Sequence, residues 1–179
     1  MDCAVIITFI FLSASLILIA NRNSSYSHIR HTISELGERG AINEKRVLFG
    51  IFLPVGIAMA LIGFAVRSNE PAAILAGSLS IGYVGAAFFP IDAGAPVKGS
   101  WRNGMHSLFG AIQYVGSIAS FEQFGRDYGL PYTAVKYVIF AFIISLYIPY
   151  IREIRGLIQR AVELGLFIGL VFMIQSSGA

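Results

Sequence analysis

The feature that most constrains this chain is a series of roughly six apolar runs, each close to the length of about 20 residues that a helix needs to cross a membrane. The runs lie at about residues 4–20, 47–66, 72–89, 105–121, 132–150 and 157–175. Only 13% of the residues are charged and 56% are hydrophobic, whereas a soluble domain carries about 25% charged residues. We therefore predict an all-α bundle of six transmembrane helices, forming a single membrane domain over residues 1–179.

Positively charged residues gather in the loops after the first, third and fifth runs. These loops carry Arg22, Arg30, Arg39, Lys45, Arg46, Lys98, Arg102, Arg152 and Arg155. An excess of Lys and Arg marks cytoplasmic loops, so we predict a multi-pass protein of the cell membrane with these three loops in the cytoplasm and both termini outside. Basic loops attract anionic head groups. The expected partners are membrane lipids rather than nucleic acid, and a homo-oligomer is left open.

The polar segment 26–37, which follows the first run, has helical spacing. At about 100° per residue its isoleucines and its leucine share one face, while His28, His31 and Glu35 lie on another. We therefore predict a short interfacial helix after the first span, with its apolar face in the membrane. Two imidazoles and a carboxylate one turn apart are able to converge on a metal ion. The alternative is a pair of interfacial histidines, with Glu35 paired to His31 or to Arg39.

A polar hairpin at 88–106 separates the third and fourth runs. Asp92 follows the end of one predicted helix and His106 opens the next, and these are the ends where the helix dipole disfavours an anion and a cation, respectively. The unfavourable interaction of each side chain with its helix dipole would be offset if the two side chains faced each other or a shared cation. We predict that Asp92 and His106 meet as an acid–base pair or as metal ligands. The alternatives are that the same pair only clamps the hairpin, or that both residues lie in the hydrated head-group region without a role. Any metal would be a divalent ion held by Asp92, His106 and His31.

Three short patterns resemble those of a known membrane family. They are Ile33-Ser34-Glu35-Leu36-Gly37 after the first run, Phe89-Pro90-Ile91-Asp92 at the end of the third, and His106 at the start of the fourth. In these, and in the order and length of its runs, the chain resembles the small bacterial and archaeal family catalogued as domain of unknown function 998. The resemblance implies a six-helix integral membrane protein of a prokaryotic plasma membrane and no established substrate. It implies a polar site at Ser34, Asp92 and His106, whereas His28 and His31 lie outside the family pattern.

Three classes of function fit these features. The first is a membrane protein that binds lipid or a membrane partner through a cytoplasmic-side polar pocket. The second is a membrane-embedded enzyme acting on a lipid or head group, with Asp92, His106, Ser34 and Glu35 as candidate catalytic residues. A hydrolase that used the Ser34 hydroxyl would need His106 within hydrogen-bond reach and a group that orients the imidazole. The third is a small-solute transporter, indicated only by a few polar side chains and a proline within the runs. Glu163, inside the last run, is a weaker candidate for the same pocket.

Overall fold

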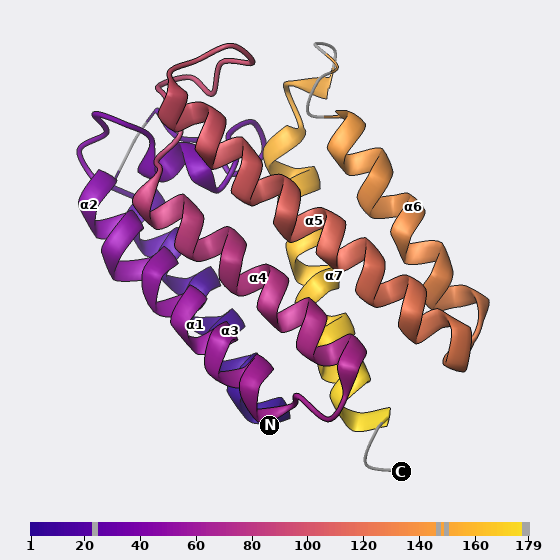
Figure 1. The fold of residues 1–179 in the computed structure, drawn as a ribbon. Coiled ribbons are helices and arrows are strands. Elements are labelled where there is room, and N and C mark those ends of the chain that lie inside the picture. Colours follow the sequence, from indigo (N-terminus) through magenta and orange to yellow (C-terminus); the bar gives the residue numbers. More distant parts are fainter. Residues whose placement is uncertain (23–24, 146–147, 149–150, 177–179) are drawn as a thin grey trace.

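The computed structural model describes residues 1–22, 25–145, 148 and 151–176, and the regular secondary structure of these residues is all helical (Figure 1). This confirms the predicted all-α class. The long helices are α1 (Asp2–Ala20), α3 (Leu53–Ala65), α4 (Glu70–Phe88), α5 (Trp101–Tyr128), α6 (Leu130–Ser145) and α7 (Arg155–Ser176). The shorter elements are the 3₁₀ turn η1 (Ser34–Gly37), the helix α2 (Glu44–Val47) and the π-helical stretch η2 (Leu48–Phe52), which joins α2 to α3.

Four helices of the described chain are long and apolar enough to cross a membrane. They span Asp2–Ala20, Glu44–Ala65, Glu70–Phe88 and Arg155–Ser176. The apolar part of α6, Pro131–Ser145, is shorter, and part of the predicted fifth span lies outside the described residues. Helix α5 has 28 residues but a more polar composition. A topology of six spans therefore stays a prediction.

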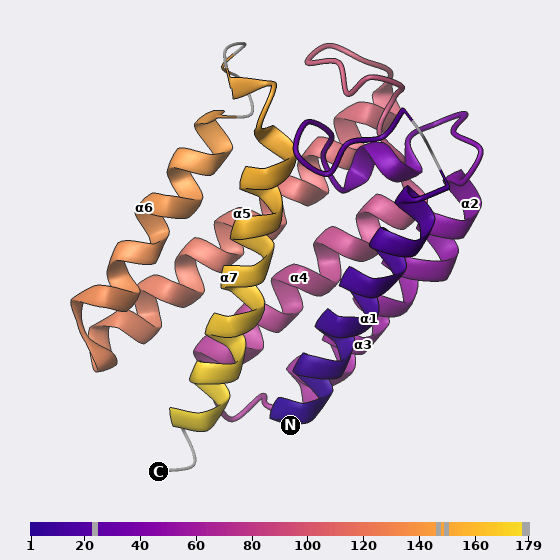
Figure 2. The ribbon, with the colours of Figure 1, turned by 180° about the vertical axis from the view of Figure 1, so that it is seen from behind.

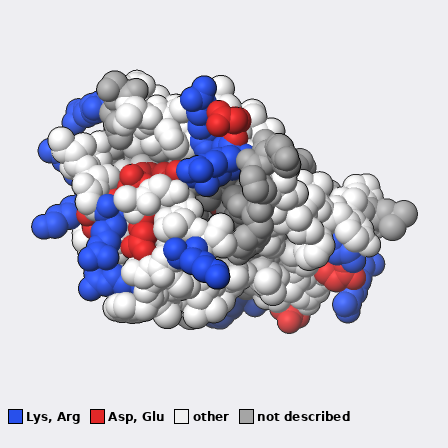
Figure 3. All heavy atoms as spheres, turned by 90° about the horizontal axis from the view of Figure 1, so that it is seen from above, with Lys and Arg blue, Asp and Glu red and all other residues white. Residues whose placement is uncertain are grey.

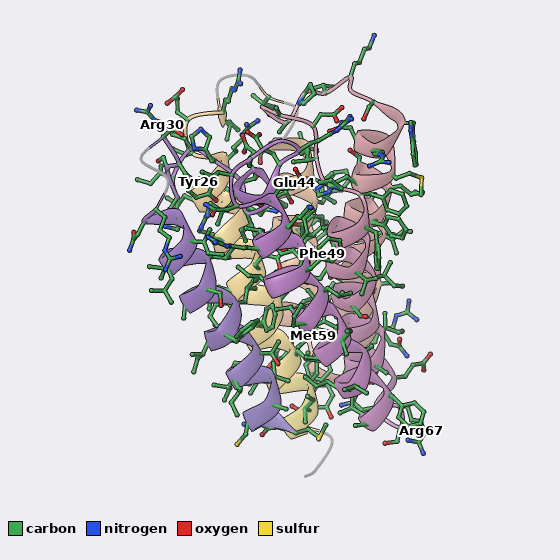
Figure 4. All side chains as sticks on the ribbon, turned by 90° about the vertical axis from the view of Figure 1, so that its left-hand side faces the viewer. Tyr26, Arg30, Glu44, Phe49, Met59 and Arg67 are labelled. Atoms are coloured by element: carbon green, nitrogen blue, oxygen red, sulfur yellow. The ribbon has the colours of Figure 1, made fainter. Side chains whose placement is uncertain are left out.

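The loops after α1, α4 and α6 lie at one end of the bundle, and the start of α1 and the end of α7 lie at the other (Figures 1 and 2). Tyr26, Arg30 and Glu44 mark the loop end and Arg67 marks the opposite end (Figure 4). Figure 3 looks down on the loop end, where Lys and Arg side chains surround several carboxylates. The basic loops predicted to be cytoplasmic thus share one end of the molecule.

Helices α4 and α5 approach closely because α4 has glycines where they meet. A Cβ added to Gly82 would overlap Gln113, and one added to Gly85 would overlap Phe109. Helices in lipid associate through close packing of this kind, since there is no hydrophobic drive between them. The α4–α5 contact also brings the end of α4 next to the start of α5, and these two ends supply residues of the candidate site described below.

Replacing Gly85 by alanine is expected to destabilise the fold by about 1–3 kcal/mol, because the new methyl group displaces the Phe109 ring. Gly77, on the same helix, has no atom within 4 Å of an added Cβ. Gly77→Ala is therefore expected to be neutral or to stabilise the helix by about 0.5–1 kcal/mol. Thermal unfolding of both variants in the same detergent measures the difference, and equal stabilities would argue against this packing.

The prediction of a short interfacial helix after the first run is wrong. Only Ser34–Gly37 forms a 3₁₀ turn, and turns and irregular backbone make up the rest of the described segment. Side chains accept hydrogen bonds from backbone N–H groups that would donate to backbone carbonyl groups in a helix. The ring Nδ1 of His31 accepts the Ser27 N–H at 2.8 Å, and a Glu35 carboxylate oxygen accepts the Thr32 N–H at 2.6 Å. Local bonds of this kind compete with helix formation.

Candidate functional site

Ser34 and His106 are in direct contact at the loop end of the bundle. Nε2 of His106 lies 3.1 Å from Oγ of Ser34, and Nδ1 lies 2.8 Å from the carbonyl oxygen of Phe89. A carbonyl oxygen only accepts hydrogen bonds, so Nδ1 carries a proton. In the neutral ring, Nε2 then accepts the hydrogen bond that the Ser34 hydroxyl donates. A hydroxyl, a base and a group that orients the base are thus connected, which is the arrangement that activates a nucleophile.

The ends of α4 and α5 hold the imidazole. Phe89 directly follows α4, and its ring stacks on Phe109 at a centroid distance of 5.5 Å and meets Trp101 edge-on at 5.9 Å. Trp101, His106 and Phe109 all belong to the first turns of α5. The last carbonyl groups of a helix have no partner within it. The imidazole N–H therefore satisfies a carbonyl that the end of α4 leaves free.

The segment around Ser34 is fixed on both sides. The N–H of Ile33 donates to Oε1 of Gln159 on α7 at 2.8 Å, and the Ile33 side chain is buried. On the other side, Gly37 lies so close to Val47 that an added Cβ would be 2.7 Å from its Cγ1. These contacts hold the Ser34 hydroxyl in a defined position although it belongs to a connecting segment.

Glu35, the neighbour of Ser34, forms a buried ion pair with α7. Its Oε1 lies 2.6 Å from Nη2 of Arg155, and the two side chains are 5% and 12% exposed, respectively. Its Oε2 accepts the N–H and the hydroxyl of Thr32 at 2.6 and 2.8 Å. The partner of Glu35 is thus neither His31 nor Arg39, as predicted, but Arg155, which is 120 residues away in sequence. Nε of Arg155 is buried and has no hydrogen-bond partner among the described residues.

Asp92 is bound to Ser100, and within the described residues no hydrogen bond joins Asp92 to His106. Its Oδ2 accepts the Ser100 N–H at 2.6 Å and its Oδ1 accepts the Ser100 hydroxyl at 2.9 Å. Ser100 is the N-cap of α5, where the helix dipole favours an anion. The carboxylate therefore lies at the N-terminal end of α5, which favours an anion, and not at the C-terminal end of α4, which disfavours one. Asp92 therefore clamps the hairpin to the start of α5 through Ser100, whereas the clamp considered from the sequence joined Asp92 to His106.

Acidification is expected to loosen this clamp. The amide and hydroxyl of Ser100, and more weakly the Arg39 guanidinium, hold the pKa of Asp92 below its ordinary value. A pKa lowered by folding means that the bond stabilises the hairpin above the unfolded-state pKa and is lost as the pH falls through the lowered value. The protection factor of the Ser100 amide against hydrogen exchange should therefore be high at neutral pH and fall in acid. Asp92→Asn should lower it at neutral pH and remove its dependence on pH, and a pH-independent value in the native chain would contradict the clamp.

The structure does not bring the three predicted metal ligands together. Among the described residues, no group of three or more His, Cys, Asp and Glu side chains is placed to hold a metal ion. Nδ1 of His31 accepts the Ser27 N–H, while Asp92 and His106 have the separate partners given above. The predicted set of Asp92, His106 and His31 is thus divided among three hydrogen-bond networks.

A cavity of about 280 Å³ opens beside Ser34 and His106 and extends into the bundle. Most of its wall is apolar. Its polar lining residues come from the segment before η1 and from η1, α4, α5 and α7, and they are Thr32, Ser34, Tyr83, Asn103, His106, Ser107, Gln113, Tyr114, Arg155, Gln159 and Glu163. Three helices and the segment around Ser34 therefore contribute polar side chains to one cavity, with the Ser34–His106 pair in its wall.

Glu163 of α7 also lines this cavity and is 3% exposed. Its Oε1 accepts the side-chain amide of Gln113 at 2.7 Å and the hydroxyl of Tyr114 at 3.0 Å. Its Oε2 accepts the hydroxyl of Tyr83 at 2.9 Å. Sequence reasoning gave Glu163 little weight and missed all three of its donors. A signal was present, because an acidic residue inside an apolar run is a functional candidate.

The all-helical fold, with four helices long and apolar enough to cross a membrane, defines a helical protein of the membrane type. The chain belongs to the family described as Protein of unknown function (DUF998), which matches residues 5–175. This confirms the family resemblance inferred from the sequence. Neither a curated protein nor a solved structure matches the chain.

Proposed function

We propose that the chain is a membrane-embedded enzyme that uses the Ser34 hydroxyl to cleave or transfer an acyl ester of a lipid. The observation that carries the proposal is the hydrogen-bonded line from Ser34 Oγ through the His106 ring to the Phe89 carbonyl oxygen, set in the wall of a cavity. It meets both requirements for a serine nucleophile, a base within hydrogen-bond reach and a group that orients the base.

The chemistry follows from the tautomer of His106. Nε2 takes the hydroxyl proton as Ser34 Oγ attacks the ester carbonyl carbon, and the Phe89 carbonyl oxygen stabilises the resulting imidazolium through Nδ1–H. Nε2 then gives this proton to the departing alcohol oxygen, which leaves an acyl group on Ser34. Water or a second alcohol attacks the acyl group, and His106 again takes the proton and returns it to Ser34 Oγ. The released product is a carboxylic acid or a new ester.

A lipid is the substrate class that suits the cavity. An apolar wall accommodates an acyl chain, and polar groups at the loop end suit a head group. Arg155 lines the cavity and its Nε has no partner among the described residues. Its Nη2 is paired with Glu35, so Nε–H is the donor that would bind a phosphate or stabilise the oxyanion that forms during acyl transfer.

The test is hydrolysis of p-nitrophenyl butyrate and of phospholipids in mixed micelles by the purified full chain. We expect ester cleavage by the native protein and by Ser107→Ala, and none above background by Ser34→Ala. Ser107 is the matched control because it also lines the cavity. Cleavage that survives in Ser34→Ala, or native protein inactive on every ester offered, would overturn the proposal.

A second candidate is lipid binding through the same cavity without chemistry. It is favoured by the buried, unpaired Nε of Arg155 beside a mostly apolar wall. Under this alternative, anionic phospholipid co-purifies with the native chain and with Ser34→Ala but is lost from Arg155→Gln, and no ester is cleaved. Lipid analysis of the three purified proteins together with the esterase assay separates the two functions.

We also propose a multi-pass arrangement in the cell membrane with the loop end in the cytoplasm, which the clustering of Lys and Arg at that end supports. Cys3 is the one cysteine of the chain and is exposed, so it reports the side on which α1 begins. A membrane-impermeant maleimide should label Cys3 in intact cells. Cysteine placed at Arg39 in a Cys3→Ser background should be labelled only after permeabilisation, and the reverse pattern would invert the topology.

A further inference from the structure

We infer that the inner part of the cavity binds the positively charged ammonium group of an amphiphile, with the Glu163 carboxylate as its counter-ion. The inference concerns binding and goes beyond the chemistry proposed for Ser34, because it rests on different residues. Its first support is the set of groups that surround the Glu163 carboxyl group. The three groups that donate to this carboxylate, from Tyr83, Gln113 and Tyr114, are all neutral. Among the described residues, no ion pair includes Glu163.

A carboxylate buried without a cationic partner is costly, and more so within a membrane bundle. Among the described residues that line the cavity, the basic side chain is that of Arg155, and its guanidinium is already paired with Glu35. The positive charge that would balance Glu163 is therefore best supplied by a ligand in the cavity.

The carboxylate has room for such a ligand. Its two oxygens offer about four acceptor positions, and Tyr83, Gln113 and Tyr114 use three of them. Glu163 also lines the cavity wall. An ammonium N–H in the cavity is thus able to donate to Glu163 without displacing any of the three existing donors.

Aromatic rings beside Glu163 favour an organic ammonium ion. Phe52, Tyr83 and Tyr114 all line the cavity, and Phe52 and Tyr83 lie edge-to-face at a centroid distance of 5.9 Å. The faces of aromatic rings attract ammonium groups by a cation–π interaction. A carboxylate flanked by aromatic rings suits an alkylammonium ion better than a neutral alcohol of the same length.

The position of Glu163 sets the shape of the ligand. Arg155, Gln159 and Glu163 follow one another at four-residue spacing on α7, and all three line the cavity. Arg155 and Glu163 are therefore about 12 Å apart along the helix axis, given the rise per residue of an α-helix. The ammonium group would sit one to two helical turns deeper than the Ser34–His106 pair, beyond the buried ion pair of Glu35 and Arg155.

Calorimetric titration of the full chain in detergent with hexylamine, and separately with hexanol, tests the inference. The native protein should bind hexylamine at least about tenfold more tightly than hexanol. Glu163→Gln keeps the size of the side chain and removes its charge, so it should abolish the preference while leaving hexanol binding unchanged. Glu153→Gln is the matched control, because Glu153 is an exposed carboxylate paired with Arg30 at the loop end, and it should keep the native preference.

Equal affinity of the native protein for hexylamine and hexanol would overturn the inference, and this result needs no variant to fold. A full preference retained by Glu163→Gln would also overturn it. Because Ser34→Ala should bind hexylamine as the native chain does, failure of this inference is distinguishable from failure of the acyl-transfer proposal. A protein that prefers hexylamine but cleaves no ester would overturn only the acyl-transfer proposal.

Discussion

His106→Asn is expected to lower ester cleavage by about two to four orders of magnitude, the contribution of a positioned general base. The asparagine amide keeps a hydrogen-bond donor near the position of Nδ1, so the Phe89 carbonyl oxygen retains a partner. It offers no basic nitrogen to the Ser34 hydroxyl. The variant should therefore fold as the native chain does and lose kcat rather than substrate affinity.

The measurement is kcat and KM for p-nitrophenyl butyrate beside thermal unfolding of the same preparations. His28→Asn serves as the control, because His28 lies in the same connecting segment as Ser34 but does not line the cavity. Its kcat should match that of the native protein. Similar kcat values for His106→Asn and His28→Asn would show that His106 is not the base.

Glu35→Ala is expected to destabilise the folded protein by about 3–5 kcal/mol, the cost of leaving one partner of a buried ion pair alone. The substitution strands the Arg155 guanidinium, which is 12% exposed. It also removes the acceptor for the N–H and hydroxyl of Thr32. Since Glu35 directly follows Ser34, the loss should also loosen the segment that positions the nucleophile.

The exposed pair Arg30–Glu153 provides the comparison, because its side chains are 66% and 72% exposed. Glu153→Ala should cost no more than about 1 kcal/mol. A double-mutant cycle of Glu35→Ala with Arg155→Ala then isolates the coupling of the buried pair. A cost for Glu35→Ala no larger than for Glu153→Ala would mean that this pair does not anchor the segment.

The position of α4 was predictable because its cause is local. The run 72–89 corresponds to α4 at Glu70–Phe88, whose start is fixed by the Asn69 side chain accepting the Ala72 N–H. Apolar length decides where such helices lie. The segment before Ser34 was not predictable in this way. Its side chains have helical spacing, but the same side chains also accept hydrogen bonds from nearby backbone N–H groups, and these bonds compete with helix formation.

The candidate site was predictable only in part. Ser34 and His106 were both named from the sequence, yet their contact depends on the packing of α4 against α5. The dipole argument led us to expect that Asp92 finds a partner away from the end of α4. It paired Asp92 with His106, whereas the N-cap of α5 at Ser100 is nearer along the chain and has an N–H to offer. The link between Glu35 and Arg155 joins distant parts of the chain, so no local pattern reveals it.

Covalent labelling of Ser34 by a fluorophosphonate, which reacts with activated serine hydroxyls, tests the central claim most directly. The full chain would be treated in detergent, digested and mapped by mass spectrometry. The predicted result is an adduct on Ser34 in the native protein and in Ser107→Ala, and a large loss of that adduct in His106→Asn. An unmodified Ser34 in the native protein, or equal labelling of Ser34 with and without His106, would contradict the account.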